Sequence, residues 1–302
     1  MIAERLASYA FFILSSKNNF TIVIVTFKSE KVIETCLNSI DQKYAVIIVE
    51  NSRDVSFKKN IESKFPNVKC YLTGSNIGMG SANNIGIKLA KTNYVLILNP
   101  DVKLAQNTII NLTSEIELIN NFAIAAPTEI TDLKKKNYGF FNNNHSKINN
   151  RPFKVDYVDG FAMLINKSRF KKNIFFDENI FMYLENNDLC KRTIENNENV
   201  YVIPKSQIVH FGAKAVSDEF FNEVEFSRNW HWMWSTFYFN KKHYGYFFAL
   251  KKAYTKLITS IIKYLFFTLT FNPIKKKIYL MRFSGLYNSI IGKKSWYRPK
   301  IK

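Results

Sequence analysis

The residues best placed for chemistry follow apolar runs of the sequence. Asp101 comes after the run 94–98, and Pro100 cannot continue a strand, so the chain must turn there. His210 ends a later apolar run, 207–210. Ligands of open α/β sheets bind beyond the carboxyl ends of the strands, and carboxylate and imidazole are metal ligands. Asp101 and His210 are therefore candidates for a metal and phosphate site. The structural alternatives are that Asp101 is a simple turn residue and that His210 is a core or edge histidine.

A glycine-rich turn stands just before these residues in the sequence. Gly74, Gly78 and Gly80 allow backbone conformations that a Cβ would forbid, and a helix is expected from Ser81. The turn resembles the start of a dinucleotide fingerprint, but Asn83 occupies the position of its third glycine. The stretch is therefore either a tight turn or a loop that lies against phosphates.

A cluster of acidic and amide residues at 185–188 is the candidate for proton transfer. If it is helical, Glu185, Asp188 and Arg192 lie on the same side. A carboxylate in the aromatic surroundings of Phe181 and Tyr183 could act as a general base toward an attacking hydroxyl. Carboxylates at a helix start and an Asp188–Arg192 ion pair would explain the same residues structurally. Spacing alone favours that structural interpretation.

The elements that would position these residues alternate between strand and helix. Short β-branched apolar runs predict buried strands, and apolar residues at helical spacing lie between them. This alternation predicts βαβ units, a mostly parallel sheet and an α/β fold. The polar segment 131–154 breaks the pattern and indicates a lid or a disordered loop. Strands are expected at 21–26, 45–49, 68–72, 94–98, 123–126, 200–204 and 207–212, and helices at 30–40, 56–65, 81–91 and 105–120.

The charge of the chain is concentrated at its carboxyl end. The net charge is +19, no Asp or Glu follows Glu225, and residues 241–302 contain fifteen Lys or Arg. Such a segment suits nucleic acid or an anionic membrane. Interleaved aromatic and aliphatic residues at 244–272 favour helices in the membrane interface, with a helical cap as the alternative. No nucleic-acid-binding module is recognisable, so nucleic acid is not expected as a partner.

Cysteines and the first residues add two further expectations. Cys36, Cys70 and Cys190 are odd in number and lack CxxC spacing, which indicates buried thiols, a reducing compartment and no zinc site. Residues 1–19 suggest a short amphipathic segment rather than a cleaved signal. No apolar run reaches 18 residues, so no transmembrane helix is expected.

Taken in order, the motifs from about residue 20 to 245 resemble the family 2 inverting glycosyltransferases, in particular the rhamnosyltransferase-like branch of bacterial O-antigen and capsule biosynthesis. The resemblance implies a GT-A fold over 20–225, and the charge and composition of the tail indicate a basic amphipathic helical region over 226–302. It also implies inverting transfer of a hexose, with dTDP-L-rhamnose as donor. The matching stretches are TIVIVTFKSE, CLNSI, VIIVENS, NIGMGSANNIGI, YVLILNPD, VDGFAMLI, FDENIFMYLENNDLCKR and IPKSQIVHFG.

The resemblance also implies partners and contacts. The partners are a nucleotide-diphosphate sugar, a polyprenyl-diphosphate-linked glycan acceptor and an anionic membrane, at the cytoplasmic face of the inner membrane. Asp101 would bind a divalent cation, Mg²⁺ or Mn²⁺, together with the diphosphate, and His210 would approach them. The donor contacts would come from Thr26 and Glu50 (base and ribose), Asn76, Gly78, Asn83 and Asn99 (nucleotide sugar), and Asp159 and Gly160 (sugar or acceptor).

Two departures from the family pattern bear on activity. Glu50 stands where Asp is usual, so contacts to the base or ribose are expected to differ. Asn186 stands where the family usually has the Asp that is assigned as the general base, and an amide cannot take a proton. We therefore expect Asp188 and Glu185 to supply the base.

Two other functions remain open from the sequence. One is a catalytically silent donor-binding or scaffold subunit. The other is a nucleotidyltransferase, which would need a Gly-rich, Arg-containing loop after the first strand where this chain has Lys28-Ser29-Glu30.

Overall fold

The computed structural model describes residues 20–119, 121–131, 136–141, 150–212 and 220–299, so the expected amphipathic segment 1–19 lies outside the described residues. The chain divides into two compact units. The first contains Met1–Ile77, Ser81–Phe176 and Leu189–Ala215. The second contains Gly78–Gly80, Asp177–Asp188 and Val216–Lys302. The division thus falls inside the glycine-rich turn and inside two helices, α4 (Met79–Leu89) and α6 (Glu185–Glu195).

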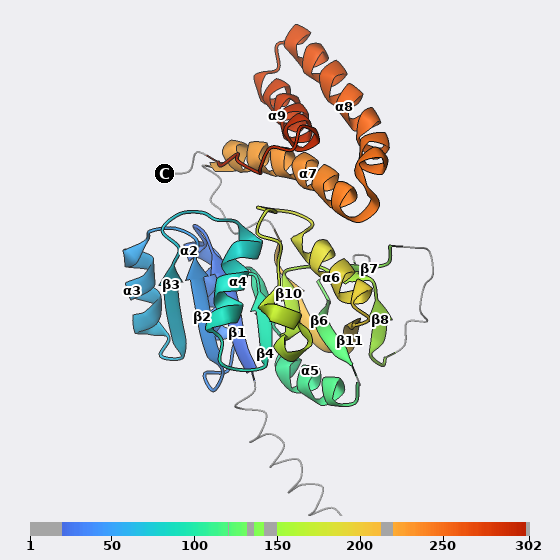
Figure 1. The fold of residues 1–302 in the computed structure, drawn as a ribbon. Helices are drawn as coiled ribbons and strands as arrows, with labels where there is room; N and C mark the ends of the chain where they lie inside the picture. The colour runs from blue at the N-terminus through green and yellow to red at the C-terminus, as the bar shows by residue number, and fades with distance from the viewer. Residues whose placement is uncertain (1–19, 120, 132–135, 142–149, 213–219, 300–302) are drawn as a thin grey trace, which may run out of the picture. The chain divides into compact units, whose positions relative to one another are not determined.

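A mixed, mostly parallel sheet forms the first unit (Figure 1), as the alternation of strands and helices predicts. Its order is β3-β2-β1-β4-β10-β6-β11-β5, with β8 paired to β11. Strands β10, β5 and β8 run against the other six. The strands are β1 (Phe20–Thr26), β2 (Ala45–Glu50), β3 (Val68–Leu72), β4 (Tyr94–Leu98), β5 (Val102–Leu104), β6 (Phe122–Glu129), β8 (Phe153–Val155), β10 (Ala162–Asn166) and β11 (Asn199–His210). A separate pair joins β7 (Tyr138–Gly139) and β9 (Tyr157–Val158).

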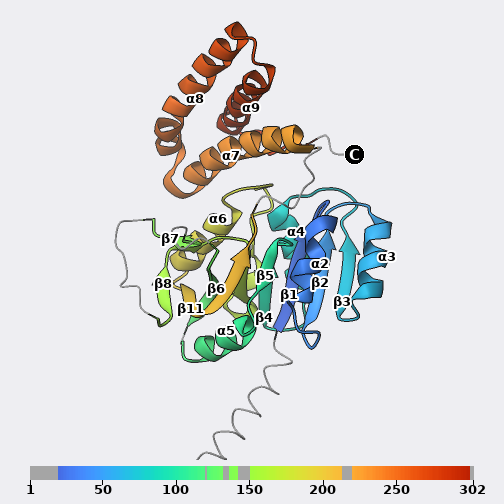
Figure 2. The ribbon, with the colours of Figure 1, turned by 180° about the vertical axis from the view of Figure 1, so that it is seen from behind.

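Helices cover both faces of this sheet (Figure 2). Apolar residues of α2 (Glu30–Asn38), α3 (Val55–Lys64) and α5 (Thr108–Glu117) share one core with the sheet. On the other face α4 (Met79–Leu89) packs closely on β1, because a Cβ at Gly86 would lie 2.3 Å from Val23 Cγ1. Two short 3₁₀ turns, η1 (Lys167–Arg169) and η2 (Lys171–Asn173), and α6 (Glu185–Glu195) complete the order.

The expected strands 200–204 and 207–212 are one continuous strand, β11. Pro204 has no N–H to donate to a neighbouring strand, and the pairing of β11 with β6 shifts register between Ile203 and Gln207. The bulge absorbs the proline, so the strand bends without ending there. The expected helix 105–120 is shorter, because a turn at 106–107 follows β5 and α5 spans only Thr108–Glu117.

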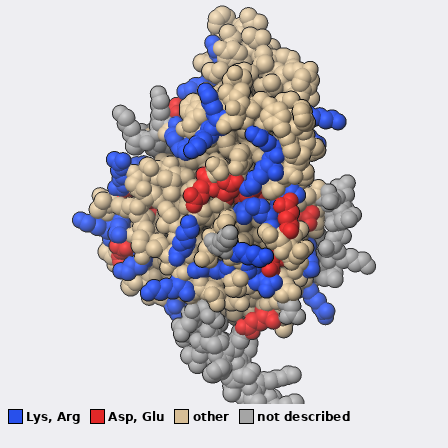
Figure 3. Space-filling view, in the orientation of Figure 1, with Lys and Arg blue, Asp and Glu red and all other residues tan. Residues whose placement is uncertain are grey.

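Three helices make up most of the second unit: α7 (Phe221–Tyr244), α8 (Tyr246–Leu269) and α9 (Pro273–Ile290). Gly245, with a φ of +88°, separates the first two. Asn272 accepts a hydrogen bond from the Lys275 amide at 3.0 Å and so caps α9. Among the described helices, none is both long enough and apolar enough to pass through a bilayer. In Figure 3 the outer part of α8 and α9 carries few charged residues.

Candidate donor-binding site

The ends of β1 and β2 hold a buried carboxylate in a fixed position. Thr26 and Glu50 are register partners on the two parallel strands. The Thr26 hydroxyl donates to Glu50 Oε2 at 2.6 Å, and the Ser52 hydroxyl donates to Oε1 at 2.5 Å. Glu50 is only 2% exposed, and this burial raises its pKa against the opposing effect of the two hydrogen bonds. Both carboxylate oxygens thus already have donors within the protein.

Asn51, which the sequence did not single out, connects the end of β2 to the loop before α4. Its Oδ1 accepts from the Ile77 amide at 2.9 Å and from the Thr73 hydroxyl at 3.2 Å. Its Nδ2 donates to Asn76 Oδ1 at 3.0 Å. Asn76, expected at the donor, is therefore oriented by Asn51. The only sequence signal for Asn51 was its place directly after Glu50.

Two of the expected donor residues keep buried oxygens without hydrogen-bond partners among the described residues. These atoms are Asn83 Oδ1, on α4, and Asn99 Oδ1, just past β4. The Asn99 backbone is fixed, because its N–H donates to the Phe161 carbonyl at 2.8 Å. Its own carbonyl lies 3.8 Å from the Cys36 thiol, whose burial, with the Asp101 charge, raises its pKa to about 12. Buried polar atoms are normally paired, so unpaired ones mark places where a ligand can bind.

Asp101 and His210 lie together, as the sequence predicts. His210 Nε2 is 3.4 Å from Asp101 Oδ1, and Asp101 is 6% exposed. The residue after His210, Phe211, donates its N–H to the Asp101 carbonyl at 3.0 Å. Phe161 stacks on the His210 ring at 4.1 Å between centroids. Burial lowers the pKa of His210, but the hydrogen bond and charge of Asp101 outweigh it, so the pKa is raised.

A hollow of about 760 Å³ opens beside this pair. Asp159 lines it together with Glu129 and His210. Burial, and then the charge of Glu129, raise the pKa of Asp159. The Asp159 N–H donates to the Asn137 carbonyl at 2.8 Å, which fixes its backbone next to Gly160. The structure therefore brings Asp101, Asp159 and His210 to one edge of the sheet.

This edge fits a hard divalent cation that also binds a diphosphate. Apart from its ion-pair contact with His210, Asp101 Oδ1 has no donor among the described residues, and Asn99 Oδ1 also lacks one. Within the same residues no group of three or more His, Cys, Asp or Glu could hold a metal. A cation here would need oxygens from the substrate, which is how Mg²⁺ is usually bound at phosphate sites.

Gly78 belongs to the second unit, and its backbone conformation and close packing explain why glycine stands at this position. Its φ is +91°, and a Cβ there would lie 2.5 Å from the Phe181 carbonyl oxygen. The following amide, of Met79, donates to that carbonyl at 3.2 Å. This packing requires glycine whether or not a donor binds, and the expected donor contact of Gly78 stays a prediction.

Glu185, the first residue of α6, differs from the other carboxylates of the second unit. Its Oε2 is buried and has no hydrogen-bond partner among the described residues. Desolvation raises its pKa to about 7. Tyr183 and Leu184, just before it, both have positive φ, at 70° and 66°. Two such residues in succession are strained, and strain of this kind gathers at functional sites.

Asp188 is instead part of a buried ionic network. It is fully buried, and its Oδ1 lies 2.8 Å from His243 Nε2 and 2.7 Å from Lys242 Nζ. Lys242 also contacts Asp177 Oδ2 at 2.7 Å, and the Tyr238 hydroxyl donates to the same oxygen at 3.0 Å. Asp188 therefore ties the start of α6 to the end of α7. This surrounding suits a positioning residue rather than a base.

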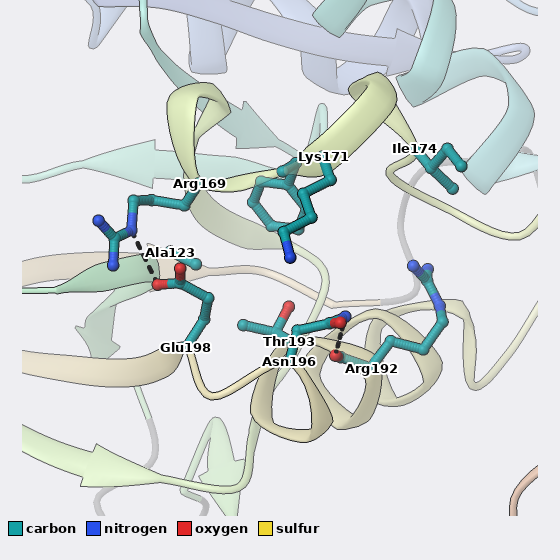
Figure 4. Close-up of a pocket in the computed structure, with 9 residues that line it drawn as sticks. Ala123, Arg169, Lys171, Ile174, Arg192, Thr193, Asn196 and Glu198 are labelled. Atoms are coloured by element: carbon teal, nitrogen blue, oxygen red, sulfur yellow. Dashed lines mark hydrogen bonds and ion pairs between the residues drawn. The ribbon is translucent and has the colours of Figure 1, made fainter.

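A second cavity, of about 280 Å³, lies near the amino ends of β6 and β11 (Figure 4). Lys171 points into it. Arg169 Nε donates to Glu198 Oε2 at 2.8 Å, and Arg192 donates to the Phe175 carbonyl. Both arginines in its wall are thus bound by protein acceptors. None of the expected donor residues lines this cavity, so the carboxyl edge of the sheet remains the candidate site.

Known proteins similar to this chain indicate its family. A hexosyltransferase of low-salt glycan biosynthesis, Agl10 of Haloferax volcanii, is 25% identical over 61% of this chain and 64% of its own length, so the chain spans less than two thirds of that relative. Rhamnosyltransferase WbbL of Escherichia coli is 25% identical over 63% of this chain and 82% of its own.

Among solved structures, a mannosyltransferase of Pyrobaculum calidifontis in complex with GDP-Man and Mn²⁺ is similar in fold. Its TM-score is 0.54 at 11% identity, over 90% of this chain and 87% of the other. The likeness confirms the expected GT-A fold. The model of "Glycosyl transferase family 2" matches residues 21–174, which is more than half of the chain. The chain therefore belongs to glycosyltransferase family 2.

Proposed function

We propose that this family 2 enzyme transfers a sugar, with inversion, from a nucleotide-diphosphate donor to a hydroxyl of a lipid-linked glycan. The observation that carries the proposal is Asp101 Oδ1, a buried carboxylate oxygen 3.4 Å from His210 with no other partner among the described residues. A diphosphate held through a cation would satisfy it. L-Rhamnose from dTDP-rhamnose is the proposed sugar, supported by the likeness to WbbL.

Each residue group has a proposed part in donor binding. Thr26 and Glu50 would lie against base and ribose, and Asn76, oriented by Asn51, would lie nearby. Asp101, with His210 beside it, would hold Mg²⁺ or Mn²⁺, which supplies charge neutralisation for the departing nucleotide diphosphate. Asp159 and Gly160 would face the sugar or acceptor. The remaining proposed contacts of the nucleotide sugar come from Gly78, Asn83 and Asn99.

For the chemical step we propose Glu185 as the general base. The acceptor hydroxyl oxygen attacks the anomeric carbon as the carbon–oxygen bond to the diphosphate breaks, and the nucleotide diphosphate leaves with that electron pair. The hydroxyl proton passes to the Glu185 carboxylate. A pKa of about 7 suits a base working near neutral pH. Asp188 would act through its network by holding the start of α6.

The alternative is a donor-binding subunit without transfer activity. It is favoured by Asn186, whose amide cannot accept a proton, and by the buried ionic network of Asp188. Such a protein would keep the Asp101 site and bind the nucleotide sugar without consuming it.

One experiment separates the two proposals. Purified full-length protein is incubated with a panel of nucleotide sugars, with Mg²⁺, Mn²⁺ or EDTA, and with membrane extract as acceptor source. Transfer from one donor that EDTA abolishes supports the enzyme. Tight donor binding without turnover supports the silent subunit. If no donor binds at all, both proposals are wrong.

The place of reaction is proposed together with the acceptor. A polyprenyl-diphosphate glycan is held in a bilayer, so we propose peripheral action at the cytoplasmic face of the inner membrane. The basic carboxyl-terminal segment, with fifteen Lys or Arg in 241–302, supports this location.

A further inference from the structure

Helix α8 has two apolar faces, and only one is packed. Small residues of the inner face, Ala249, Ala253 and Ser260, are buried. The two alanines share a core with Met233 of α7 and Leu286 of α9. Since small side chains allow close approach, this inner face accounts for the packing of the three helices.

The outer face of α8 is an apolar stripe that is exposed along the whole helix. Its members recur mostly at intervals of three and four residues, so they lie on one side of the helix. At 1.5 Å per residue the stripe is about 33 Å long. Exposure is highest at Phe247 (85%) and Leu269 (78%), and Phe271 in the following turn reaches 90%. The outer stripe consists of Phe247, Leu250, Tyr254, Ile258, Ile261, Ile262, Leu265, Phe266 and Leu269.

Positive charge lies on and beside this stripe: Lys251 is one turn from Phe247 and Tyr254. On α9, Lys277 pairs with Glu223 of α7 at 3.3 Å. No Asp or Glu follows Glu225. Lys263 lies 5.2 Å from the ring centre of Tyr279, and Lys275 lies 5.3 Å from that of Phe267. Desolvation lowers the pKa of Lys256, and the neighbouring cations Arg282 and Lys252 lower it further. Cations are crowded here, so an anionic partner would relieve mutual repulsion.

The charge also decides among possible occupants of the stripe. A second copy of this chain would bring an equally basic surface against the first, and like charges oppose such a contact. A helix crossing a bilayer is not available among the described helices. An amphipathic helix with lysines beside an aromatic and aliphatic face binds in the plane of the membrane interface, where lysine heads reach anionic headgroups.

We propose that the outer stripe of α8, together with Phe271, is a membrane-binding surface that lies flat in the interface of an anionic phospholipid bilayer. This surface specifies which part of the protein would make the peripheral membrane contact proposed above, and the inference rests on that proposed function. Binding itself can be measured without any sugar, so its failure and the failure of transfer activity are distinguishable.

The test is flotation of the full-length protein with two kinds of vesicles, phosphatidylcholine alone and phosphatidylcholine with phosphatidylglycerol. The double variant Ile262→Glu/Leu269→Glu places charge on the stripe at two exposed sites (59% and 78% exposed). We expect the double variant to bind anionic vesicles with an affinity at least about tenfold lower than that of the unmodified protein. A matched control is Leu118→Glu, the same change at a position 79% exposed in the first unit, which should not alter binding.

A second variant tests the charge. Lys275→Gln/Lys276→Gln/Lys277→Gln should lower affinity for anionic vesicles by about tenfold or more and weaken its dependence on salt. Equal binding of the unmodified protein to both vesicle types would overturn the proposal. So would unchanged binding of the stripe variant, or an equal loss with Leu118→Glu. Circular dichroism confirms that each variant is folded, and transfer to a detergent-dispersed acceptor should persist in the stripe variant.

Discussion

The carboxyl edge of the sheet and the network around Asp188 both bury a carboxylate, but they treat it differently. Asp101 keeps an oxygen whose one contact among the described residues is His210 at 3.4 Å. Asp188 has Lys242 at 2.7 Å and His243 at 2.8 Å on the same oxygen. Burying an underpaired carboxylate is unfavourable, and removing one partner of a buried ion pair is strongly destabilising. The contrast is what the proposed roles predict, with Asp101 binding a ligand and Asp188 holding the start of α6 in place.

Glu185 extends this contrast within α6. It stands three residues before Asp188, yet its Oε2 has no hydrogen-bond partner among the described residues, and its pKa rises to about 7. By the criterion that distinguishes Asp101 from Asp188, Glu185 resembles Asp101, the residue proposed to bind a ligand. Four substitutions test this division, beginning with the largest expected effect.

Asp101→Asn should reduce transfer by about 10³-fold and abolish the metal dependence of donor binding, because the charge that would hold the cation is lost. Steady-state kinetics and titration calorimetry with and without Mn²⁺ measure both effects. Asp41→Asn, on an exposed carboxylate, is the control and should leave both unchanged. Metal-dependent donor binding that survives Asp101→Asn would refute the site.

Glu185→Gln should lower kcat by 10² to 10⁴-fold, roughly the contribution of a general base, while donor affinity stays the same. In the unmodified enzyme the base must be deprotonated, so kcat should rise with pH and level off above about 7. Glu195→Gln, exposed on the same helix, is the matched control. Full activity of Glu185→Gln would exclude it as the base.

The same substitution has a predicted effect on stability. A folded-state pKa of about 7, above the unfolded value, means that the free energy of unfolding falls as pH rises from about 4.5 to about 7. Removing the charge should therefore make Glu185→Gln more stable than the unmodified protein at pH 8, by up to about 3 kcal/mol. Urea unfolding at pH 5 and pH 8 measures this difference.

Asp188→Asn should destabilise the protein by about 3 kcal/mol, because Lys242 and His243 lose their buried carboxylate partner. Donor binding, measured where the variant is still folded, should persist. Thermal unfolding and calorimetry provide the two readouts. A loss of kcat with unchanged stability would instead identify Asp188 as the base and reverse the comparison.

Thr26→Val is expected to have the smallest effect, a loss of about 1 to 2 kcal/mol, because Glu50 Oε2 loses its 2.6 Å donor. The pKa of Glu50 is already raised by burial, and the Thr26 hydroxyl opposes that rise. Without the Thr26 hydroxyl the ionised form of Glu50 is less stable, so the loss of unfolding free energy should be larger at pH 7 than at pH 4. A deficit independent of pH would mean that the hydroxyl does not act on Glu50.

The pairing of Asp101 with His210 could be predicted because both end apolar runs of one α/β sheet, and carboxyl ends of parallel strands share an edge. The partners of Asp188 could not, because Lys242 and His243 lie more than fifty residues away on a helix with no clear apolar periodicity. Asn51 was missed because its role depends on where the loop before α4 returns. The single strand β11 was predicted as two because Pro204 normally ends a strand.

The Cys36 thiol beneath Asn99 offers a built-in reporter of this edge. A thiol with a pKa of about 12 reacts with an alkylating reagent only when the structure around it opens, because the thiolate is the nucleophile. Cys70 and Cys190 are also buried thiols, so each of the three reports on its own neighbourhood. A nucleotide sugar that binds at Asn99 should slow the labelling of Cys36 selectively. The labelling rate would then measure local opening of this edge without any enzymatic turnover.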